Sequence, residues 1–192
     1  MPYKTNAPKI LDAIKKSDHI LLVSHEKPDG DTLGASLALA HYLDSENKQY
    51  KHYCFNKPAE YFNYLSKIEN LIHDYDQIEL NDHDLVITID CGDIRRTRIE
   101  EDLQKSKNIT IINIDHHESN DNFGHHNLVI PKASSTSEII YNFFAYHNIE
   151  IDKYMATSIL TGIITDTMNF TNAATTDESL QIAADLLNKE PE

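Results

Sequence analysis

The sequence predicts an α/β fold in which a parallel β-sheet is covered by helices on both faces. Short apolar runs alternate with segments whose apolar residues recur every three or four positions. These runs are nearly continuous, which is typical of strands buried on both faces. The chain has 192 residues, of which 40% are hydrophobic and 25% are charged, so we expect one globular domain with a substantial core.

The first half of the chain is expected to form a strand, a polar loop, a helix and a second strand in this order. Apolar residues at spacings of four and three predict a helix over residues 32–43, packed on the sheet. The run over residues 20–23 is predicted to be a buried strand. The other elements expected here are a helix over 8–16, a strand over 50–55 and a helical stretch over 60–71.

The second half continues this alternation. Apolar runs predict strands over residues 85–89 and 109–114. Ser135 followed by Glu138 has the form of a capping box and predicts the start of a helix with an apolar stripe. Two more helices are expected, over residues 154–164 and 176–188, the second with Thr175 and Glu178 as a capping box.

Composition excludes several function classes. Lys and Arg number 17 against 31 Asp and Glu, a net charge of −14, which argues against a broad surface for duplex nucleic acid. No apolar run approaches the roughly 18 residues of a membrane span, and the start has no signal-peptide pattern, so we expect a cytoplasmic protein. Cys54 and Cys91 are expected to be free, buried thiols.

Acids and imidazoles follow the predicted strands at the points where these strands end. The residues after the strands are His25, Asp29, Asp31, Asp90, Asp115, His116 and His117, and Asp166 ends an apolar helix. Because the carboxyl ends of parallel strands share one edge, these side chains are expected to converge there. Each motif alone has an ordinary explanation as a turn, a helix cap or a polar loop. The ordered set is much harder to explain in that way.

Clustered carboxylates repel one another unless cations lie among them. Oxygen-rich ligation with few imidazoles suits Mn²⁺ or Mg²⁺ better than Zn²⁺. A site with two metal ions needs a carboxylate that bridges them, and Asp90, alone at its strand end, is our candidate for the bridge.

These motifs resemble those of the DHH phosphoesterase family. The matching patterns are His25-x-x-x-Asp29-x-Asp31, Asp90, Asp115-His116-His117 and Gly162-x-x-x-Asp166. Within the family, residues 133–141 are most similar to the NrnA-like branch, which contains oligoribonucleases and 3′-phosphoadenosine 5′-phosphate phosphatases. The resemblance covers residues 20–170 and implies the DHH domain fold.

The resemblance also implies roles for individual residues. His25 and Asp29 would bind one ion, and Asp90 would bridge it to a second ion bound by three further side chains: Asp31, His116 and Asp166. The ions would be Mn²⁺, with Mg²⁺ or Co²⁺ as alternatives, and a hydroxide generated between them would attack phosphorus. His117 would face the scissile phosphate, and Asp115 would orient a metal-bound imidazole.

Substrate contacts are less defined by the sequence. Ser134 and Ser135 offer hydroxyls and a helix N-terminus to a phosphate, although plain capping explains Ser135 equally well. Arg96 belongs to the densest basic group, which either meets an anionic substrate or a neighbouring subunit, or is a solvated face. Relatives often have Gly-Asp-Thr-Gly-x-Phe where this chain has residues 165–170, so substrate contacts in that loop are expected to differ.

The chain lacks the Gly-Gly-Gly-His motif of the C-terminal DHH-associated domain. We therefore expect residues 1–188 to be the DHH catalytic domain, residues 189–192 to start a linker, and the C-terminal substrate-binding domain to be absent from this chain.

The predicted function is hydrolysis of phosphate esters in small nucleotides or very short single-stranded oligonucleotides. The first alternative is an inorganic pyrophosphatase or exopolyphosphatase of the same superfamily. The second is a catalytically silent module that binds metal or nucleotide. Neither duplex nucleic acid nor a membrane is an expected partner, and a homodimer through the sheet edge is conceivable.

Overall fold

The computed structural model describes residues 2–191 and confirms the predicted parallel sheet, which has five strands instead of the four expected. The strand order is β2-β1-β3-β4-β5, so β3 is central. The strands are β1 (His19–Ser24), β2 (Gln49–Tyr53), β3 (Leu85–Ile89), β4 (Thr110–Asp115) and β5 (His126–Val129).

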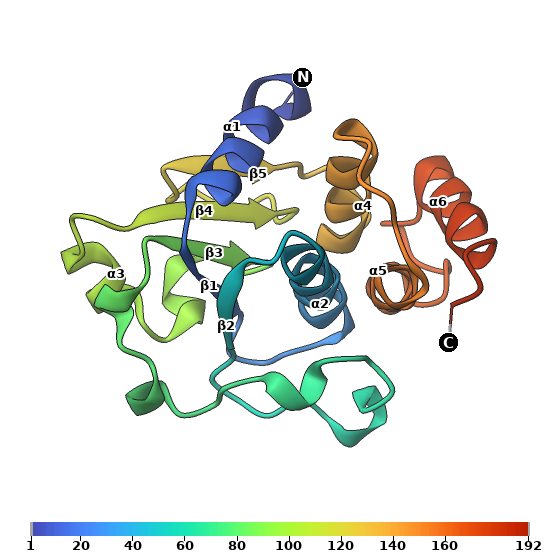
Figure 1. The fold of residues 1–192 in the computed structure, drawn as a ribbon. Coiled ribbons are helices and arrows are strands. Elements are labelled where there is room, and N and C mark those ends of the chain that lie inside the picture. Colours follow the sequence, from blue (N-terminus) through green and yellow to red (C-terminus); the bar gives the residue numbers. More distant parts are fainter. Residues whose placement is uncertain (1, 192) are drawn as a thin grey trace.

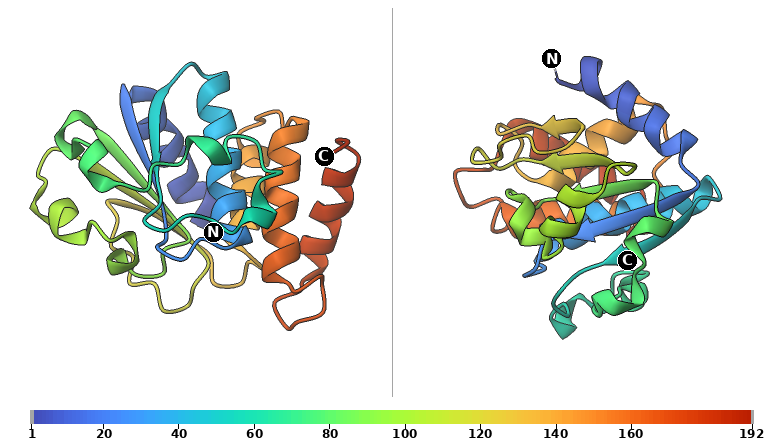
Figure 2. Two further views of the ribbon diagram at one scale, coloured as in Figure 1. Left: turned by 90° about the horizontal axis from the view of Figure 1, so that it is seen from below. Right: turned by 90° about the vertical axis from the view of Figure 1, so that its left-hand side faces the viewer.

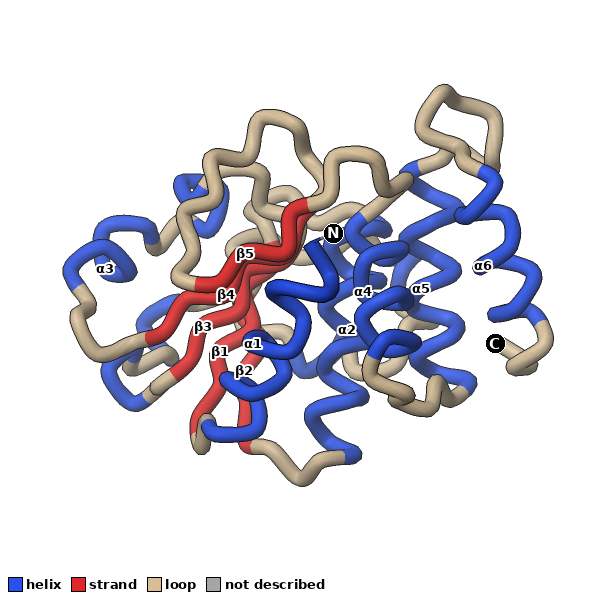
Figure 3. Tube along the Cα trace, turned by 90° about the horizontal axis from the view of Figure 1, so that it is seen from above, coloured by secondary structure: helices blue, strands red, loops and turns tan. Residues whose placement is uncertain are grey.

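Helices cover the two faces of the sheet unequally. The helices are α1 (Pro2–Lys16), α2 (Gly30–Ser45), α3 (Glu100–Lys105), α4 (Thr136–Tyr146), α5 (Lys153–Asp166) and α6 (Asp177–Leu187). One face carries α1, α2 and α4, with α5 and α6 stacked farther out (Figures 1 and 3). The other face carries α3 and short 3₁₀ turns (Figure 2). None of the described helices is long and apolar enough to cross a membrane.

The core explains why the strands are apolar without alternation. Ile20 and Leu22 of β1 point into the large cluster shared with α1, α2, α4 and α5. Leu21 and Val23 point to the opposite face, where they join Leu103 of α3. Because successive strand residues face opposite sides and both sides are covered, all of β3 and residues 20–24 of β1 are buried.

The segment over residues 60–71 is not the helix that the sequence predicted. It forms two 3₁₀ turns, Glu60–Phe62 and Ile68–Asn70, separated by Lys67 in the left-handed region at φ 72°. Its apolar residues still pack on Leu33 and Leu37 of α2, so burial does not require a continuous helix.

The helix starts also differ in detail from the prediction. Ser135 caps α4, but the Glu138 carboxylate accepts hydrogen bonds from the N–H and hydroxyl of Ser134 and not from the Ser135 N–H. The predicted capping box is therefore only half formed. The reciprocal capping box at α6 uses Thr176 and Ser179, because α6 begins one residue later than expected. Strand β5 and the short helix α3 were not predicted.

The sheet topology places its switch point at the carboxyl ends of β1 and β3. From β1 the chain passes through α2 to β2 on one side, whereas β3 pairs with the other side of β1. Ser24 lies opposite Ile89, and Ile89 lies opposite Ile114, so the loops after these strands leave from one edge. Such a switch point is the usual ligand position in this type of sheet.

Helices α2 and α5 approach backbone to backbone, and this contact brings the residues at their ends together. A Cβ at Gly34 would lie 2.3 Å from the Ser158 carbonyl oxygen and 2.9 Å from the Gly162 nitrogen. A Cβ at Gly162 would lie 1.9 Å from Ser137 Oγ of α4. The glycines therefore set the spacing of the three helices.

We predict that Gly34→Ala destabilises the protein by about 1–3 kcal/mol, because the methyl group would force two packed helices apart. Urea unfolding measures this free energy. At an unconstrained helical position the same change would stabilise by about 1 kcal/mol, so a gain in stability would contradict the close contact.

Candidate metal centre

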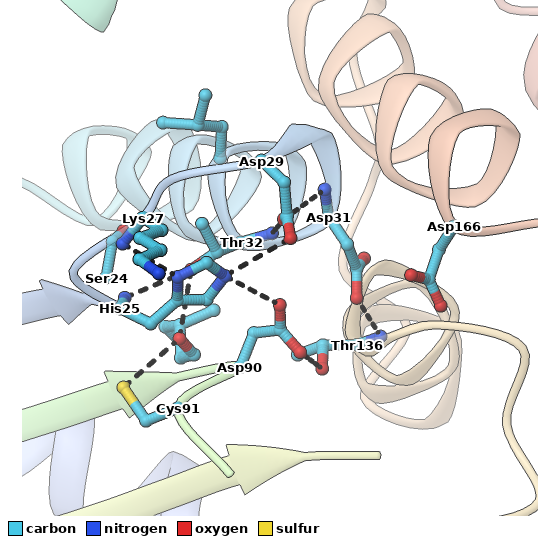
Figure 4. Close-up of polar contacts among 12 residues, drawn as sticks. Ser24, His25, Lys27, Asp29, Asp31, Thr32, Asp90, Cys91, Thr136 and Asp166 are labelled. Carbon is cyan, nitrogen blue, oxygen red and sulfur yellow. Dashed lines mark hydrogen bonds and ion pairs between the residues drawn. The ribbon is translucent and has the colours of Figure 1, made fainter. Parts of the chain in front are cut away.

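The structure brings the six predicted metal ligands together at the switch point. They come from four places in the chain: the loop after β1 with the start of α2, the loops after β3 and β4, and the end of α5. Figure 4 shows the part of this cluster that surrounds Asp90. Three groups within the described residues could each hold an ion: His25, Asp29 and Asp90; Asp31, His116 and Asp166; and Asp90, His116 and His117.

Asp90 lies between two of these groups. Its Oδ2 is 3.5 Å from His25 Nε2, which is 3.4 Å from Asp29 Oδ2. Its Oδ1 is 3.7 Å from His116 Nε2. One carboxylate thus presents a different oxygen to each group.

The second group is built around His116. Its Nε2 lies 3.5 Å from Asp166 Oδ2 and 3.9 Å from Asp31 Oδ2. Its Nδ1 is 3.3 Å from the Ala133 carbonyl oxygen, which can only accept a hydrogen bond. The proton therefore lies on Nδ1, and the Nε2 lone pair faces the carboxylates, as a metal-binding imidazole requires.

Local backbone features hold the acids in place. Asp29 caps α2, because its Oδ1 accepts hydrogen bonds from the N–H groups of Asp31 and Thr32, both at 3.1 Å. Its other oxygen remains free to face His25. Asp90 has a φ of 59°. Aspartate tolerates this left-handed conformation better than most residues, and the Asp90 N–H donates to the Ile114 carbonyl at 2.9 Å, which ties the loop to β4.

The N-terminus of α4 holds the two most buried carboxylates of the cluster. Asp31 accepts hydrogen bonds from the N–H groups of Thr136 at 2.6 Å and Ser137 at 2.8 Å. The Thr136 hydroxyl donates to Asp90 Oδ1 at 2.9 Å. Thr136 thus contacts one carboxylate from each part of the cluster, and the sequence analysis did not identify it.

The electrostatics of the cluster favour bound cations. Burial, together with the charges of Asp90 and Asp166, raises the pKa of Asp31 well above its ordinary value. Burial also raises the pKa of Asp166, assisted by Asp90 and opposed by His116. A divalent cation would remove this repulsion, and the carboxylate-rich donor set with two imidazoles suits Mn²⁺ or Mg²⁺. The residues present therefore fit the ions that the sequence implied.

Asp115 and His117 form a pair beside the cluster. The buried Asp115 carboxylate accepts a hydrogen bond from His117 Nδ1 at 2.7 Å, and Asn120 also donates to it. The hydrogen bond that His117 donates to Asp115 raises the pKa of His117, although burial opposes this. Asp115 contacts His116 only through the backbone N–H, so the imidazole that it orients is that of His117.

The predicted substrate contacts lie in different surroundings. Ser134 and Ser135 are fully buried, and both hydroxyls make hydrogen bonds with Glu138 at the start of α4. The N–H groups of the next two residues are already bonded to Asp31. A phosphate contact at these serines stays a prediction that their burial does not favour. Arg96 is partly buried and lies beside His117.

The fold and the site together define an α/β domain with an acidic, histidine-containing centre at the sheet switch point. Residues 19–163 match the family described as "DHH family, N-terminal domain", and the chain belongs to this family.

Curated relatives share most of the chain. It is 33% identical over 169 residues to a Thermus thermophilus protein named "Bifunctional oligoribonuclease and PAP phosphatase NrnA", covering 88% of this chain and 49% of the relative. It is 33% identical over 181 residues to a Streptococcus mutans protein named as a probable enzyme of the same kind, covering 93% of this chain and 55% of the relative. The chain therefore spans about half the length of these relatives.

A solved structure shares the fold over nearly the whole chain. It is an exopolyphosphatase-related protein from Bacteroides fragilis, with a TM-score of 0.90 and 27% identity. The match covers 98% of this chain and 58% of the other.

Proposed function

We propose that this chain is the catalytic domain of a phosphoesterase that hydrolyses small nucleotides or very short single-stranded oligonucleotides. The reaction uses two divalent cations, for which Mn²⁺ is the first candidate. The supporting observation is that Asp90 presents one oxygen to His25 and the other to His116, within a convergent set of acids and imidazoles. The names of the curated relatives support the choice of nucleotides.

The ligand roles follow the two groups. His25 and Asp29 would hold one ion, the group of Asp31, His116 and Asp166 would hold the other, and Asp90 would contribute a carboxylate oxygen to each. Bound there, the cations would act as Lewis acids and lower the pKa of a water molecule near the phosphate. The N-terminus of α4 holds Asp31 in position through two backbone N–H groups.

His117 contributes proton transfer. Its Nδ1 is fixed by Asp115, and its side chain is about one third exposed, at 36%, so the opposite nitrogen is available to a substrate. The hydrogen bond to Asp115 and the charge of Asp90 raise the pKa of His117, which favours the protonated ring that could donate to the leaving oxygen. Asp115, whose pKa is lowered by His117 and Asn120 against the effect of burial, stabilises the charged ring.

The test is hydrolysis by this chain, loaded with Mn²⁺, of four substrates: a dinucleotide, 3′-phosphoadenosine 5′-phosphate, a generic phosphodiester and pyrophosphate. We expect turnover of the nucleotides and none of pyrophosphate. Turnover of pyrophosphate alone would favour the pyrophosphatase alternative. Metal binding without any turnover would favour the silent module.

We predict that Thr136→Val weakens Mn²⁺ binding by about 10- to 100-fold, the usual effect of removing a hydrogen bond to a metal ligand. Valine keeps the shape and the backbone N–H but cannot donate to Asp90. Thr136→Ser keeps the hydroxyl and is expected to bind as the unchanged chain does. Calorimetric titration with Mn²⁺ measures both, and equal affinities for the two variants would rule out this role.

A further inference from the structure

Three arginines that follow β3 have different partners. Arg95 makes hydrogen bonds with Asp93, its Nε lying 3.0 Å from both carboxylate oxygens. Arg98 pairs with Glu26 and lies 5.8 Å from the centre of the Phe55 ring. The Arg96 guanidinium has no hydrogen-bond or ion-pair partner within residues 2–191.

The unpaired guanidinium is held at the edge of the candidate metal centre. A Cβ built on Gly92 would lie 3.4 Å from Arg96 Nη1 and 3.4 Å from His117 Cγ. Gly92 has a φ of 64° and follows Asp90 by two residues. The guanidinium and the imidazole therefore flank the space that the missing side chain leaves.

The backbone of Arg96 is fixed on both sides. Its N–H donates to the Asp93 carbonyl at 3.0 Å, and its own carbonyl accepts from the Glu26 N–H at 2.9 Å. Since Glu26 follows the candidate ligand His25, the turn that carries Arg96 is tied directly to the centre. The backbone position from which the Arg96 side chain reaches His117 is thus built into the loop.

An unpaired guanidinium is unexpected in a chain with a net charge of −14. Carboxylates pair with Arg95 and Arg98, whereas the Arg96 guanidinium lies beside the imidazole of His117. Guanidinium binds phosphate oxygens with a planar pair of N–H donors, and charged hydrogen bonds of this kind are among the strongest in proteins. The ligand that best fits this pair of side chains is a tetrahedral oxyanion such as phosphate.

We propose that Arg96 and His117 form a phosphate subsite over Gly92, which binds oxygens of the substrate's phosphate group and of the inorganic phosphate released from a phosphomonoester. This inference rests on the proposed function for the identity of the substrate. It selects one of the three arginines at positions 95, 96 and 98, and the other two are matched controls.

The test is the binding of inorganic phosphate to the Mn²⁺-loaded chain, measured by calorimetry. Arg96→Gln is expected to weaken phosphate binding by at least about tenfold, because it removes the charge and the paired donors. Arg95→Gln and Arg98→Gln are expected to stay within about twofold, because their guanidinium groups are already occupied by carboxylates. Mn²⁺ affinity and the thermal midpoint are expected to be the same in all three variants.

The outcomes separate this inference from the proposed function. If the unchanged chain binds phosphate through Arg96 but hydrolyses no nucleotide, the subsite stands and the proposed function fails. Equal weakening by all three variants would show a general charge effect and overturn the subsite. Unchanged binding in Arg96→Gln, or no phosphate binding by the unchanged chain, would also overturn it.

Discussion

Asp90→Asn is expected to lower nucleotide hydrolysis by about a thousandfold or more and to reduce the bound Mn²⁺ from two ions to at most one. Asparagine keeps the shape of the side chain, and its oxygen can still accept a hydrogen bond from the Thr136 hydroxyl. It lacks the negative charge that the two groups around Asp90 would share. Mn²⁺ content by native mass spectrometry and steady-state kinetics measure the two effects.

The same variant has a second expected signature in the metal-free chain. Asp90 is one of the charges that raise the pKa of Asp31, so its neutralisation relieves repulsion between buried groups. We therefore expect the metal-free variant to be at least as stable as the unchanged chain, while the stabilisation by Mn²⁺ is reduced. Asp93→Asn, on the same loop but paired with Arg95, is the control and should leave Mn²⁺ binding intact. Full Mn²⁺ binding by Asp90→Asn would exclude the bridge.

His117→Gln is expected to lower turnover by about 10²- to 10⁴-fold while two Mn²⁺ ions stay bound. Glutamine can still donate to Asp115 but cannot transfer a proton at neutral pH. Turnover and Mn²⁺ content are measured on the same sample. His126→Gln, on the edge strand β5, is the control and should change neither.

This experiment also distinguishes two roles for His117. The His117 ring lies close to Asp90 and His116, and these three residues form the third group that could hold an ion. Loss of an ion in His117→Gln would make it a ligand and contradict its role in proton transfer. Retention of both ions with slow turnover would support the pairing with Asp115.

The sequence predicted the centre of the fold better than its edges. Strands β1, β3 and β4 are buried on both sides, so their composition alone marks them, and the polar residues that follow then mark the site. Strand β5 has four residues, of which only Leu128 is buried, and this leaves too little apolar signal. Helix α3 is also short, with a single buried residue, Leu103.

Contacts between distant segments could not be read from the sequence. The serines at the start of α4 suggested a phosphate site, but the helix N-terminus is occupied by Asp31, which is more than one hundred residues away along the chain. Arg98 likewise pairs with Glu26, which is 72 residues away along the chain, whereas Arg95 pairs with Asp93 of its own loop. In each case the residue type was informative and its partner was decided by the fold.

The most direct test of the two-ion centre is a crystal structure of the chain with Mn²⁺, with anomalous diffraction recorded at the manganese edge. We predict two anomalous peaks, one on each side of the Asp90 carboxylate: the first contacted by His25 and Asp29, the second by Asp31, His116 and Asp166. A single peak, or peaks that Asp90 does not join, would contradict the account.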